Sequence, residues 1–313
     1  MWISQAKGGR NAEARDEMTA PGRISVIIPT LAEASRSESL KRAIASIRAS
    51  TAEAVQIITV VNGSRFDGDL CAWLGQQPDV VFDQIREGSS PLAQKRGRAL
   101  VNTEYFSFLD DDDEYLPGAT DRKLETLCTN PATDFVLCNG YWGAMGQENI
   151  FYPRMTGILE DPLAALFRQN WLTSCNALFR TSSIPGSFFN DPHPYAEWTW
   201  LAFTLCMANK RFALLDEPGF HQYPTPGSLS KSRAYNASYI GLYERILDAS
   251  PPESVAGAIR MRISSAWHVC ASDALASGEW LDALCCHIRS LLQPGGLRYL
   301  SYSRRLLPGW PKS

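Results

Sequence analysis

Hydrophobic residues in the first third of the chain form continuous runs, separated by segments with helical spacing. The runs at Arg23–Thr30, Val55–Val61 and Tyr105–Leu109 carry apolar side chains at successive positions, as parallel strands do when both faces are covered. Asp79–Asp83 is predicted to be a shorter strand of the same kind. Between the first two runs, Ser37–Ile47 places its apolar residues at helical intervals. Strands and helices are therefore predicted to alternate.

A further helix is predicted just before the strand at Tyr105–Leu109. Ser89 or Ser90 can cap its N-terminus, and Pro91 suits its first turn. The resulting order, β-α-β-(α)-β-α-β, favours a Rossmann-like α/β fold with a mainly parallel sheet flanked by helices. Ligands of such open sheets bind beyond the carboxyl ends of the strands, so the residues at those ends are the first candidates for a site.

The remainder of the chain continues this alternation and then becomes helical. Strands are predicted at 134–142, 172–180 and 211–218, and helices at 161–169 and from about Glu197. Three more helices are predicted near the C-terminus, at Tyr235–Ala249, Glu253–Ala276 and Trp280–Leu292. The chain is thus expected to comprise a disordered lead-in at 1–22, an α/β domain at 23–232 and a C-terminal helical region at 233–313.

The bulk composition excludes several classes of protein. A formal net charge of −3 argues against a protein that binds nucleic acid without regard to sequence. No apolar run approaches the ~20 residues of a membrane span, and the N-terminus lacks the apolar stretch of a secretion signal. The 8 cysteines include no C-x-x-C pair, which favours free thiols in a reducing compartment. We expect a cytoplasmic protein.

Acidic residues follow the strand at Tyr105–Leu109 directly, with four aspartates at Asp110–Asp113 and Glu114 behind them. Like charges this close repel, and burial would raise their pKa unless a cation neutralised them. Carboxylates on one turn, with no Lys or Arg nearby in sequence, suit Mn²⁺ or Mg²⁺, which completes its shell with phosphate oxygens. The pattern predicts a dication that holds a nucleoside diphosphate; the alternative is a solvated acidic loop.

Five segments between Arg23 and Ser232 occur in an order that is typical of one enzyme family. They are "ISVIIPT" at the first strand, "VVNGS" at the second, "FLDDDDEYLP" as a D-x-D segment, Glu197 in an acidic motif, and "LLDEPGFHQYPTPGSLS" after it. Together they resemble glycosyltransferase family 2, whose members have the GT-A fold. The resemblance implies a nucleotide-sugar donor and transfer of the sugar to an acceptor hydroxyl with inversion.

For the donor nucleotide, the resemblance implies contacts of Pro29 and Thr30 with the base. Asn62 stands where the family usually has an Asp facing a uracil edge, so a UDP-sugar is favoured and a GDP-sugar stays open. Lys95 or Arg96 would meet the diphosphate, although this segment departs from the family's usual Arg-Asn. A plain solvated helix face is the alternative for both.

For the metal, the resemblance makes Asp110 and Asp112 the two acids of the D-x-D segment. Asp112 would be the direct ligand of the Mn²⁺ or Mg²⁺ ion, and Asp110 or Asp111 would touch the ribose or the waters of the metal. Asp113 and Glu114 are expected to cap the next turn instead.

For the general base, the resemblance points to Glu197. Tyr195, Trp198 and Trp200 surround it in sequence, and partial burial would raise its pKa toward working pH. The alternative is a Glu that merely favours the helix dipole. Trp171, Trp198 and Trp200 are candidates for stacking an acceptor sugar, with core packing expected for at least one of them.

The segment after the last predicted strand carries a further metal candidate. The family often has a His or an Arg-rich loop here that reaches the diphosphate or the metal, and His221 is the candidate in this chain. A hydrogen-bonded structural histidine is the alternative. Ser228 and Ser230 match the family's S-x-S and would close over the donor as a loop.

The function predicted from these residues is a metal-dependent, inverting glycosyltransferase of bacterial polysaccharide or glycolipid assembly. Its acceptor would be a saccharide or a lipid-linked saccharide. One alternative is a sugar-1-phosphate nucleotidyltransferase, which the glycine-free segment after the first strand disfavours. Another is a non-catalytic scaffold that binds a nucleotide sugar.

The C-terminal tail, Gly296–Ser313, mixes leucines and a tryptophan with arginines and a lysine. Two interpretations of this mixture stay open. The tail contacts an anionic membrane, which would place the protein peripherally at its inner face. Alternatively, it packs on the catalytic domain or forms a homodimer contact.

Overall fold

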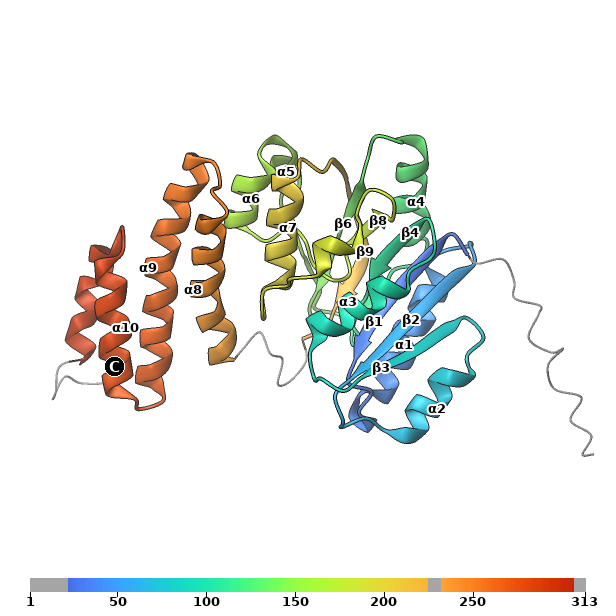
Figure 1. The fold of residues 1–313 in the computed structure, drawn as a ribbon, viewed down its shortest axis with the longest axis horizontal. Helices are drawn as coiled ribbons and strands as arrows, with labels where there is room; N and C mark the ends of the chain where they lie inside the picture. The colour runs from blue at the N-terminus through green and yellow to red at the C-terminus, as the bar shows by residue number, and fades with distance from the viewer. Residues whose placement is uncertain (1–21, 225–231, 307–313) are drawn as a thin grey trace, which may run out of the picture.

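The computed structural model describes residues 22–224 and 232–306 (Figure 1). Three regions singled out in the sequence lie outside the described residues: the lead-in up to residue 21, the loop with Ser228 and Ser230, and the end of the tail at 307–313. Across the two described ranges, none of the helices has both the length and the apolar character needed to span a bilayer.

One sheet of nine strands runs through the described part of the chain, in the order β3-β2-β1-β4-β8-β6-β9-β5, with β7 paired to β6. The strands are β1 Ile24–Thr30, β2 Val55–Asn62, β3 Val80–Ile85, β4 Tyr105–Phe108, β5 Glu114–Tyr115, β6 Phe135–Trp142, β7 Asn149–Ile150, β8 Ala177–Arg180 and β9 Phe212–Gln222. β1 to β4 pair in parallel, as do β6 and β9, whereas β8 runs antiparallel to both of its neighbours. This confirms the α/β fold with a mainly parallel sheet.

The central strands are buried because their sequences are apolar on both faces. Every residue of β1 is buried, in agreement with its continuous apolar run. In the β1–β2 register Thr30 lies opposite Val61, so the carboxyl ends of these two strands meet at the same edge. The acidic residues follow β4, which pairs in parallel with β1. The carboxyl ends of β1, β2 and β4 therefore lie along one edge of the sheet, and this is the edge predicted to bind a ligand.

Helices cover the sheet and continue beyond it. They are α1 Ser37–Ala49, α2 Gly68–Gln76, α3 Ser90–Leu100, α4 Ala119–Thr129, α5 Thr156–Glu160, α6 Pro162–Arg168, α7 Glu197–Met207, α8 Arg233–Asp248, α9 Glu253–Ala276 and α10 Trp280–Leu292, with 3₁₀ segments η1 Ala34–Arg36, η2 Gly186–Phe189 and η4 Gly296–Leu306. Ser89 caps α3 by accepting a hydrogen bond from the Leu92 N–H, as predicted. A Cβ on Gly97 of α3 would come within 2.4 Å of Ile27, so glycine sets how closely α3 lies on the sheet.

The three C-terminal helices stand side by side next to the α/β part (Figure 1). Their predicted bounds are confirmed to within two residues. Ile240, Ile246 and Ile259 of α8 and α9 belong to the same hydrophobic cluster as the sheet. Farther out, Leu306 of η4 is buried against α9 and α10 in a smaller cluster. The tail up to residue 306 thus packs on the preceding helices.

Several local predictions differ from the structure. Helix α4 was not predicted, because its short segment carries few apolar residues. The strand predicted at 172–180 begins only at Ala177, and residues 174–176 form a turn. β9 runs on to Gln222, beyond the predicted end at Pro218. Trp171 is fully buried and donates to the Pro162 carbonyl oxygen, so this tryptophan is a core residue.

Candidate active site

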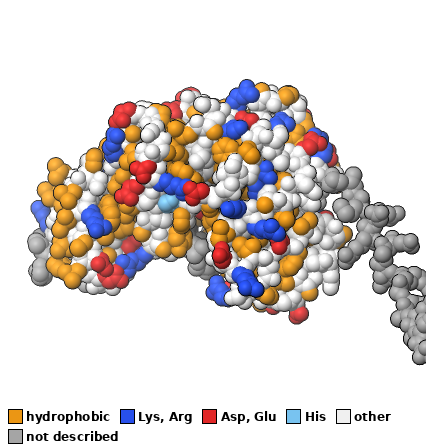
Figure 2. Space-filling model, viewed as in Figure 1, with side chains coloured by type: hydrophobic (Ala, Val, Ile, Leu, Met, Phe, Trp, Pro, Cys, Tyr) orange, Lys and Arg blue, Asp and Glu red, His pale blue; other side chains and the backbone are white. Residues whose placement is uncertain are grey.

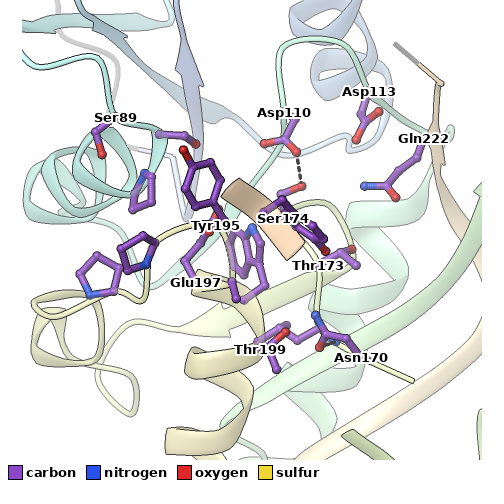
Figure 3. Close-up of a pocket in the computed structure, with 18 of the residues that line it drawn as sticks. Ser89, Asp110, Asp113, Asn170, Thr173, Ser174, Tyr195, Glu197, Thr199 and Gln222 are labelled. Carbon is purple, nitrogen blue, oxygen red and sulfur yellow. Dashed lines mark hydrogen bonds between the residues drawn. The ribbon is translucent and has the colours of Figure 1, made fainter. Parts of the chain in front are cut away.

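A cavity of about 1000 Å³ opens at the carboxyl edge of the sheet (Figure 3). One side of the cavity is formed by the acidic turn, which contributes Asp110, Asp112 and Asp113. The other side is formed by the start of α3, by residues 192–199, which lead into α7, and by α8. The cavity therefore brings the acidic turn and the segment around Glu197 together, as the sequence predicted.

Asp110 is the half-buried acid at the start of this turn. It accepts a hydrogen bond of 2.7 Å from Ser174 Oγ, and the two side chains meet at the cavity wall in Figure 3. Burial raises the pKa of Asp110 to about 7, and the negative charges of Asp112, Asp111 and Glu197 add to the rise. A carboxyl with this pKa is only partly ionised near neutral pH, and a cation in the cavity would favour its charged form.

Asp111 points away from the cavity. Thr30 Oγ1 donates to Asp111 Oδ2 at 2.5 Å, and Arg36 Nη1 lies 3.1 Å from Oδ1. Burial raises the pKa of Asp111 to about 6, against the opposing effect of these two partners. This aspartate therefore ties the acidic turn to the end of β1, and its contact with ribose or with the waters of a metal stays a prediction.

Arg36 brings a cation to the acids from a distant part of the sequence. Its Nη1 is 2.7 Å from Asp112 Oδ2, so one guanidinium bridges Asp111 and Asp112. Arg42 forms a second ion pair with Glu114, with Nε 2.5 Å from Oε1. Arg36 lies in η1 and Arg42 in α1, and both elements precede the acids by about 70 residues of sequence. Their contacts with the acids therefore cannot be predicted from the sequence around the acidic turn.

Asp113 and Glu114 do not cap the next turn, contrary to the prediction. Asp113 is buried and accepts a hydrogen bond from the backbone N–H of Tyr223 at 3.1 Å. Its pKa is raised well above the usual value, by burial first and then by Asp110 and Asp112. Glu114 begins the short strand β5 and lies opposite His221 of β9. These acids fasten the turn to the end of β9.

Glu197 is the first residue of α7 and lines the cavity across from Asp110 (Figure 3). Burial raises its pKa, and a hydrogen bond from the side chain of Gln94 works in the opposite direction. The predicted direction of the pKa shift is confirmed. Gln94 is buried on α3, so the helix whose first turn lines the cavity also holds the carboxylate of Glu197.

Tyr195 lies just before this glutamate in an unusual backbone conformation. Its φ is +62°, which a bulky residue rarely adopts, while its side chain is 39% exposed in the cavity. Trp198 also lines the cavity, whereas Trp200 stacks under Arg245 with the guanidinium carbon 3.8 Å from the ring centroid. Such strain persists only where the surrounding structure imposes it, and it clusters at functional sites.

Helix α8 completes this wall with Tyr235 and Tyr239. The helix is docked by an ion pair between Arg245 and Asp191 and by a hydrogen bond of 2.9 Å between His193 Nε2 and the Ser238 carbonyl oxygen. Sequence reasoning missed both tyrosines, because α8 was assigned to a separate C-terminal region. It missed Ser174 as well, since that residue was predicted to lie inside a strand.

Two predicted diphosphate residues lie away from the cavity. Lys95 Nζ donates to the Asn190 carbonyl oxygen at 3.4 Å, and Arg96 pairs with Asp83 at 2.5 Å. Neither side chain lines the cavity. The helical register of α3 explains this, because the cavity meets only the first turn of the helix, at Ser90–Leu92. The alternative of a helix face without ligand contacts fits these bonds better.

The predicted base-binding residues lie together at the ends of β1 and β2. Pro29, Thr30 and Asn62 are all buried, and Asn62 Nδ2 donates to the Thr30 carbonyl oxygen at 2.9 Å. Gly63, with φ +88°, follows Asn62 and brings the chain close to Gly88 at the cavity rim. The three residues thus lie together without lining the cavity, and their contact with a base stays a prediction.

The donor set fits a hard dication through two residues. Asp110 and Asp112 offer carboxylate oxygens at the cavity surface, which Mn²⁺ and Mg²⁺ prefer. His221 does not join them: it is buried, with Nε2 2.9 Å from the Gly143 carbonyl oxygen and its ring stacked on Tyr223. Within the described residues, no cluster of three or more His, Cys, Asp or Glu side chains is arranged as a metal site. His221 therefore lies apart from the two aspartates, and the binding of a metal by Asp110 and Asp112 stays a prediction.

Comparison with known families decides the class of the protein. The profile "Glycosyl transferase family 2" matches residues 25–185, from β1 to the turn after β8. The chain belongs to glycosyltransferase family 2. The match includes the acidic turn and ends before Glu197 and α8, so the second wall of the cavity lies outside it. No curated protein matches the sequence.

Solved structures of TarS from S. aureus share the fold. TarS 1-349 aligns with a TM-score of 0.56 at 13% sequence identity, covering 86% of this chain and 81% of that one. Its complex with UDP-GlcNAc aligns with a TM-score of 0.57 at 14% identity, covering 91% and 85%. The chain spans 42% of the longer TarS structure. The likeness, together with the family match, shows the GT-A fold.

Proposed function

We propose that the protein transfers a sugar from a nucleoside-diphosphate sugar, with UDP as the favoured nucleotide, to an acceptor hydroxyl with inversion. The observation that carries the proposal is one cavity with Asp110 and Asp112 on one wall and Glu197 on the other. UDP and UDP-GlcNAc are bound in TarS structures of the same fold, which supports a UDP-sugar as donor.

In this mechanism the acceptor hydroxyl attacks the anomeric carbon of the donor sugar. Glu197 takes the hydroxyl proton, the new glycosidic bond forms, and the bond from the anomeric carbon to the diphosphate oxygen breaks with its electron pair leaving on the diphosphate. Burial, which raises the pKa of Glu197, strengthens it as a proton acceptor. Inversion follows because attack and departure occur on opposite faces, with no covalent enzyme intermediate.

The departing diphosphate requires positive charge beside the acidic turn. Asp112 and Asp110 would hold Mn²⁺ or Mg²⁺, which supplies electrostatic stabilisation of the leaving group. Arg36 pairs with Asp112 at 2.7 Å and neutralises part of the charge on that carboxylate. Arg36 does not line the cavity, and neither do Lys95 and Arg96, to which the sequence had assigned contact with the diphosphate.

The acceptor wall is aromatic. Tyr195, Trp198, Tyr235 and Tyr239 line the side that holds Glu197. Aromatic faces with a polar edge suit the apolar face of a sugar ring. We therefore propose a saccharide acceptor, free or lipid-linked, and a place in bacterial polysaccharide or glycolipid assembly.

The test is a donor panel. The protein is incubated with UDP- and GDP-sugars, with Mn²⁺, Mg²⁺ or EDTA, and release of the nucleoside diphosphate is measured with and without saccharide acceptors. Turnover with one donor that is lost in Asp112→Asn supports the proposal. Binding of the nucleotide sugar without any turnover would favour the alternative of a non-catalytic scaffold instead.

A further inference from the structure

Helix α10 exposes an apolar stripe at the C-terminal end of the described chain. Leu281, Cys285, Ile288 and Leu292 follow one another at intervals of four, three and four residues, which places them on one face of the helix. All four are exposed. Nothing in the described part of the chain covers this stripe, although the opposite face of α10 packs on α9 and η4.

The next segment, η4, extends the exposed apolar surface. Leu297 and Leu300 are one 3₁₀ turn apart, and they are 76% and 57% exposed. Leu292 and Leu297 are the two most exposed large hydrophobic side chains among the described residues. Figure 2 shows hydrophobic side chains gathered at this end of the molecule, with Lys and Arg side chains among them. The residues that we call the C-terminal face are Leu281, Cys285, Ile288, Leu292, Leu297 and Leu300.

The charge along most of this face is of one sign, and Asp282, beside Leu281 at the start of α10, is the exception. Residues 283–306 contain Arg289, Arg298, Arg304 and Arg305 and no Asp or Glu. All four arginines are exposed. In the remainder of the chain acids outnumber bases, since the net charge of the whole is −3. The C-terminal face is thus a basic and apolar surface on an acidic protein.

A small polar pocket of about 300 Å³ lies between α9 and η4. His268, Ser272, Arg298, Tyr299 and Arg305 line it, with no carboxylate among its lining residues. The pKa of His268 is lowered, by burial first and then by His287, Arg298 and Arg305, which indicates a positive potential there. Two guanidinium groups with hydroxyl donors form a suitable receptor for a phosphate group.

A second copy of the chain is the competing occupant of this face. In a two-fold contact the same surface meets itself, which would bring Arg304 and Arg305 toward their own counterparts. An anionic lipid surface suits both features, because leucines enter the acyl boundary while arginines contact phosphates. Charge complementarity therefore favours the lipid surface.

We propose that the C-terminal face is a docking surface for an anionic phospholipid membrane, in which the leucines of α10 and η4 insert and the pocket beside Arg298 and Arg305 takes a headgroup phosphate. This inference does not depend on the proposed transfer reaction. The packing of η4 on α9 and α10, through bonds such as Trp280 Nε1 to the Leu306 carbonyl oxygen at 2.8 Å, presents the face as a preformed surface.

Flotation of the full chain with vesicles tests the proposal. We expect flotation with vesicles that contain phosphatidylglycerol and none with phosphatidylcholine alone. Leu297→Ser/Leu300→Ser should abolish it, whereas the matched exposed pair Ile150→Ser/Leu159→Ser should not. Arg304→Gln/Arg305→Gln should lower the partition coefficient of the protein into anionic vesicles roughly 30-fold at low salt. Each basic residue near an anionic surface contributes about 1 kcal/mol to the free energy of membrane binding. Arg86→Gln/Arg154→Gln is the charge control.

The two exposed cysteines provide a direct readout of position. Cys285 lies on the face, and Cys128 lies at the end of α4. With Cys286→Ser in both proteins, an environment-sensitive dye is attached to Cys285 in a Cys128→Ser variant, or to Cys128 in a Cys285→Ser variant. Anionic vesicles should shift the emission of the dye at Cys285 to shorter wavelength and leave the dye at Cys128 unchanged.

Three outcomes would overturn the proposal. The first is absence of flotation with both kinds of vesicle. The second is a dimer in solution that the Leu297→Ser/Leu300→Ser variant dissociates, which would make a second copy the occupant. The third is thermal stabilisation by inorganic phosphate that Arg298→Gln removes, without vesicle binding, which would make the pocket a site for a soluble anion. Donor turnover should be unchanged in all these variants, so a failure here leaves the proposed transfer reaction intact.

Discussion

Arg36 Nη1 lies 2.7 Å from Asp112 Oδ2, and the same guanidinium contacts Asp111, 75 residues away in sequence. A positive charge thus already neutralises part of the acidic turn at the edge where a dication is proposed to bind. Because a guanidinium and a dication compete for the same carboxylate oxygens, this ion pair sets how tightly the turn can hold a metal.

Replacing Arg36 by alanine should strengthen the binding of Mn²⁺. Two like charges near a protein surface repel by a few kcal/mol, so removing one should raise the affinity about tenfold or more. Titration of the free protein with Mn²⁺, followed by electron paramagnetic resonance, measures this. Arg42→Ala is the matched control, since Arg42 pairs with Glu114, which does not line the cavity. Weaker binding in Arg36→Ala would mean that Arg36 orders the carboxylates for the metal.

The acidic turn predicts how stability depends on pH. The pKa of Asp110 is about 7 in the folded protein and 3.8 in the unfolded chain, so the folded state binds more protons between these values. The free energy of unfolding of the metal-free protein should therefore fall as pH rises from about 4 to about 7. Asp110→Asn cannot ionise, and it should be more stable than the wild type at pH 8, by roughly 2–4 kcal/mol at most.

Urea unfolding at a series of pH values, in the presence of EDTA, measures this effect. Glu104→Gln is a suitable control because Glu104 is an exposed carboxylate in a surface ion pair. A wild-type stability that rises through the same pH window would show that the acidic turn is not strained by its charge.

Gln94 should control the pH dependence of transfer through Glu197. Its hydrogen bond to Glu197 opposes the rise in pKa that burial causes, so Gln94→Leu should raise the pKa of Glu197 further. The base must be ionised to accept a proton, and the acid limb of the kcat profile should therefore move to higher pH. Glu197→Gln should lower kcat by about 10²–10⁴-fold, with donor binding nearly unchanged. An unmoved acid limb in Gln94→Leu would assign the limb to another group.

Substitutions at Tyr195 can separate the effect of its strained backbone from the effect of its ring in the cavity. Glycine tolerates φ +62° at no steric cost, so Tyr195→Gly should fold with unchanged or slightly higher stability. Loss of the ring should nonetheless raise the acceptor KM about tenfold or more, while Tyr195→Phe retains the wild-type value. Steady-state kinetics with the acceptor found in the donor panel, together with melting curves, make the comparison. An unchanged KM in Tyr195→Gly would leave the ring without a part in acceptor binding.

The sequence was sufficient to predict the sheet, because parallel strands that are buried on both faces have continuous apolar runs such as that of β1. It placed Glu197 opposite the acidic turn only through the family resemblance, and the structure shows both in one cavity. It could not place Arg36, Ser174 or Tyr235, because their contacts join segments that lie far apart in the chain. For Arg36 the sequence offered one signal. This arginine follows β1 closely, and the edge of the sheet where β1 ends was already the expected site.

Lys95 and His221 both lie away from the cavity, and for a shared physical reason. A motif position gives the element on which a residue lies, but the direction of its side chain depends on the register of that element. In α3 this register turns Lys95 toward Asn190, and the extension of β9 places His221 inside a strand, opposite Glu114. Neither direction can be obtained without the neighbouring elements.

The end of the family match at residue 185 divides the cavity between two stretches of the gene. The acidic turn and α3 are encoded before this point, whereas Tyr195, Glu197 and α8 are encoded after it. A recombination event near the turn before η2 would exchange the acceptor wall and keep the acids that face it. If the proposed acceptor wall selects the acceptor, replacing this one contiguous segment should change the acceptor, and a chimera joined at this point should retain the donor of its N-terminal parent.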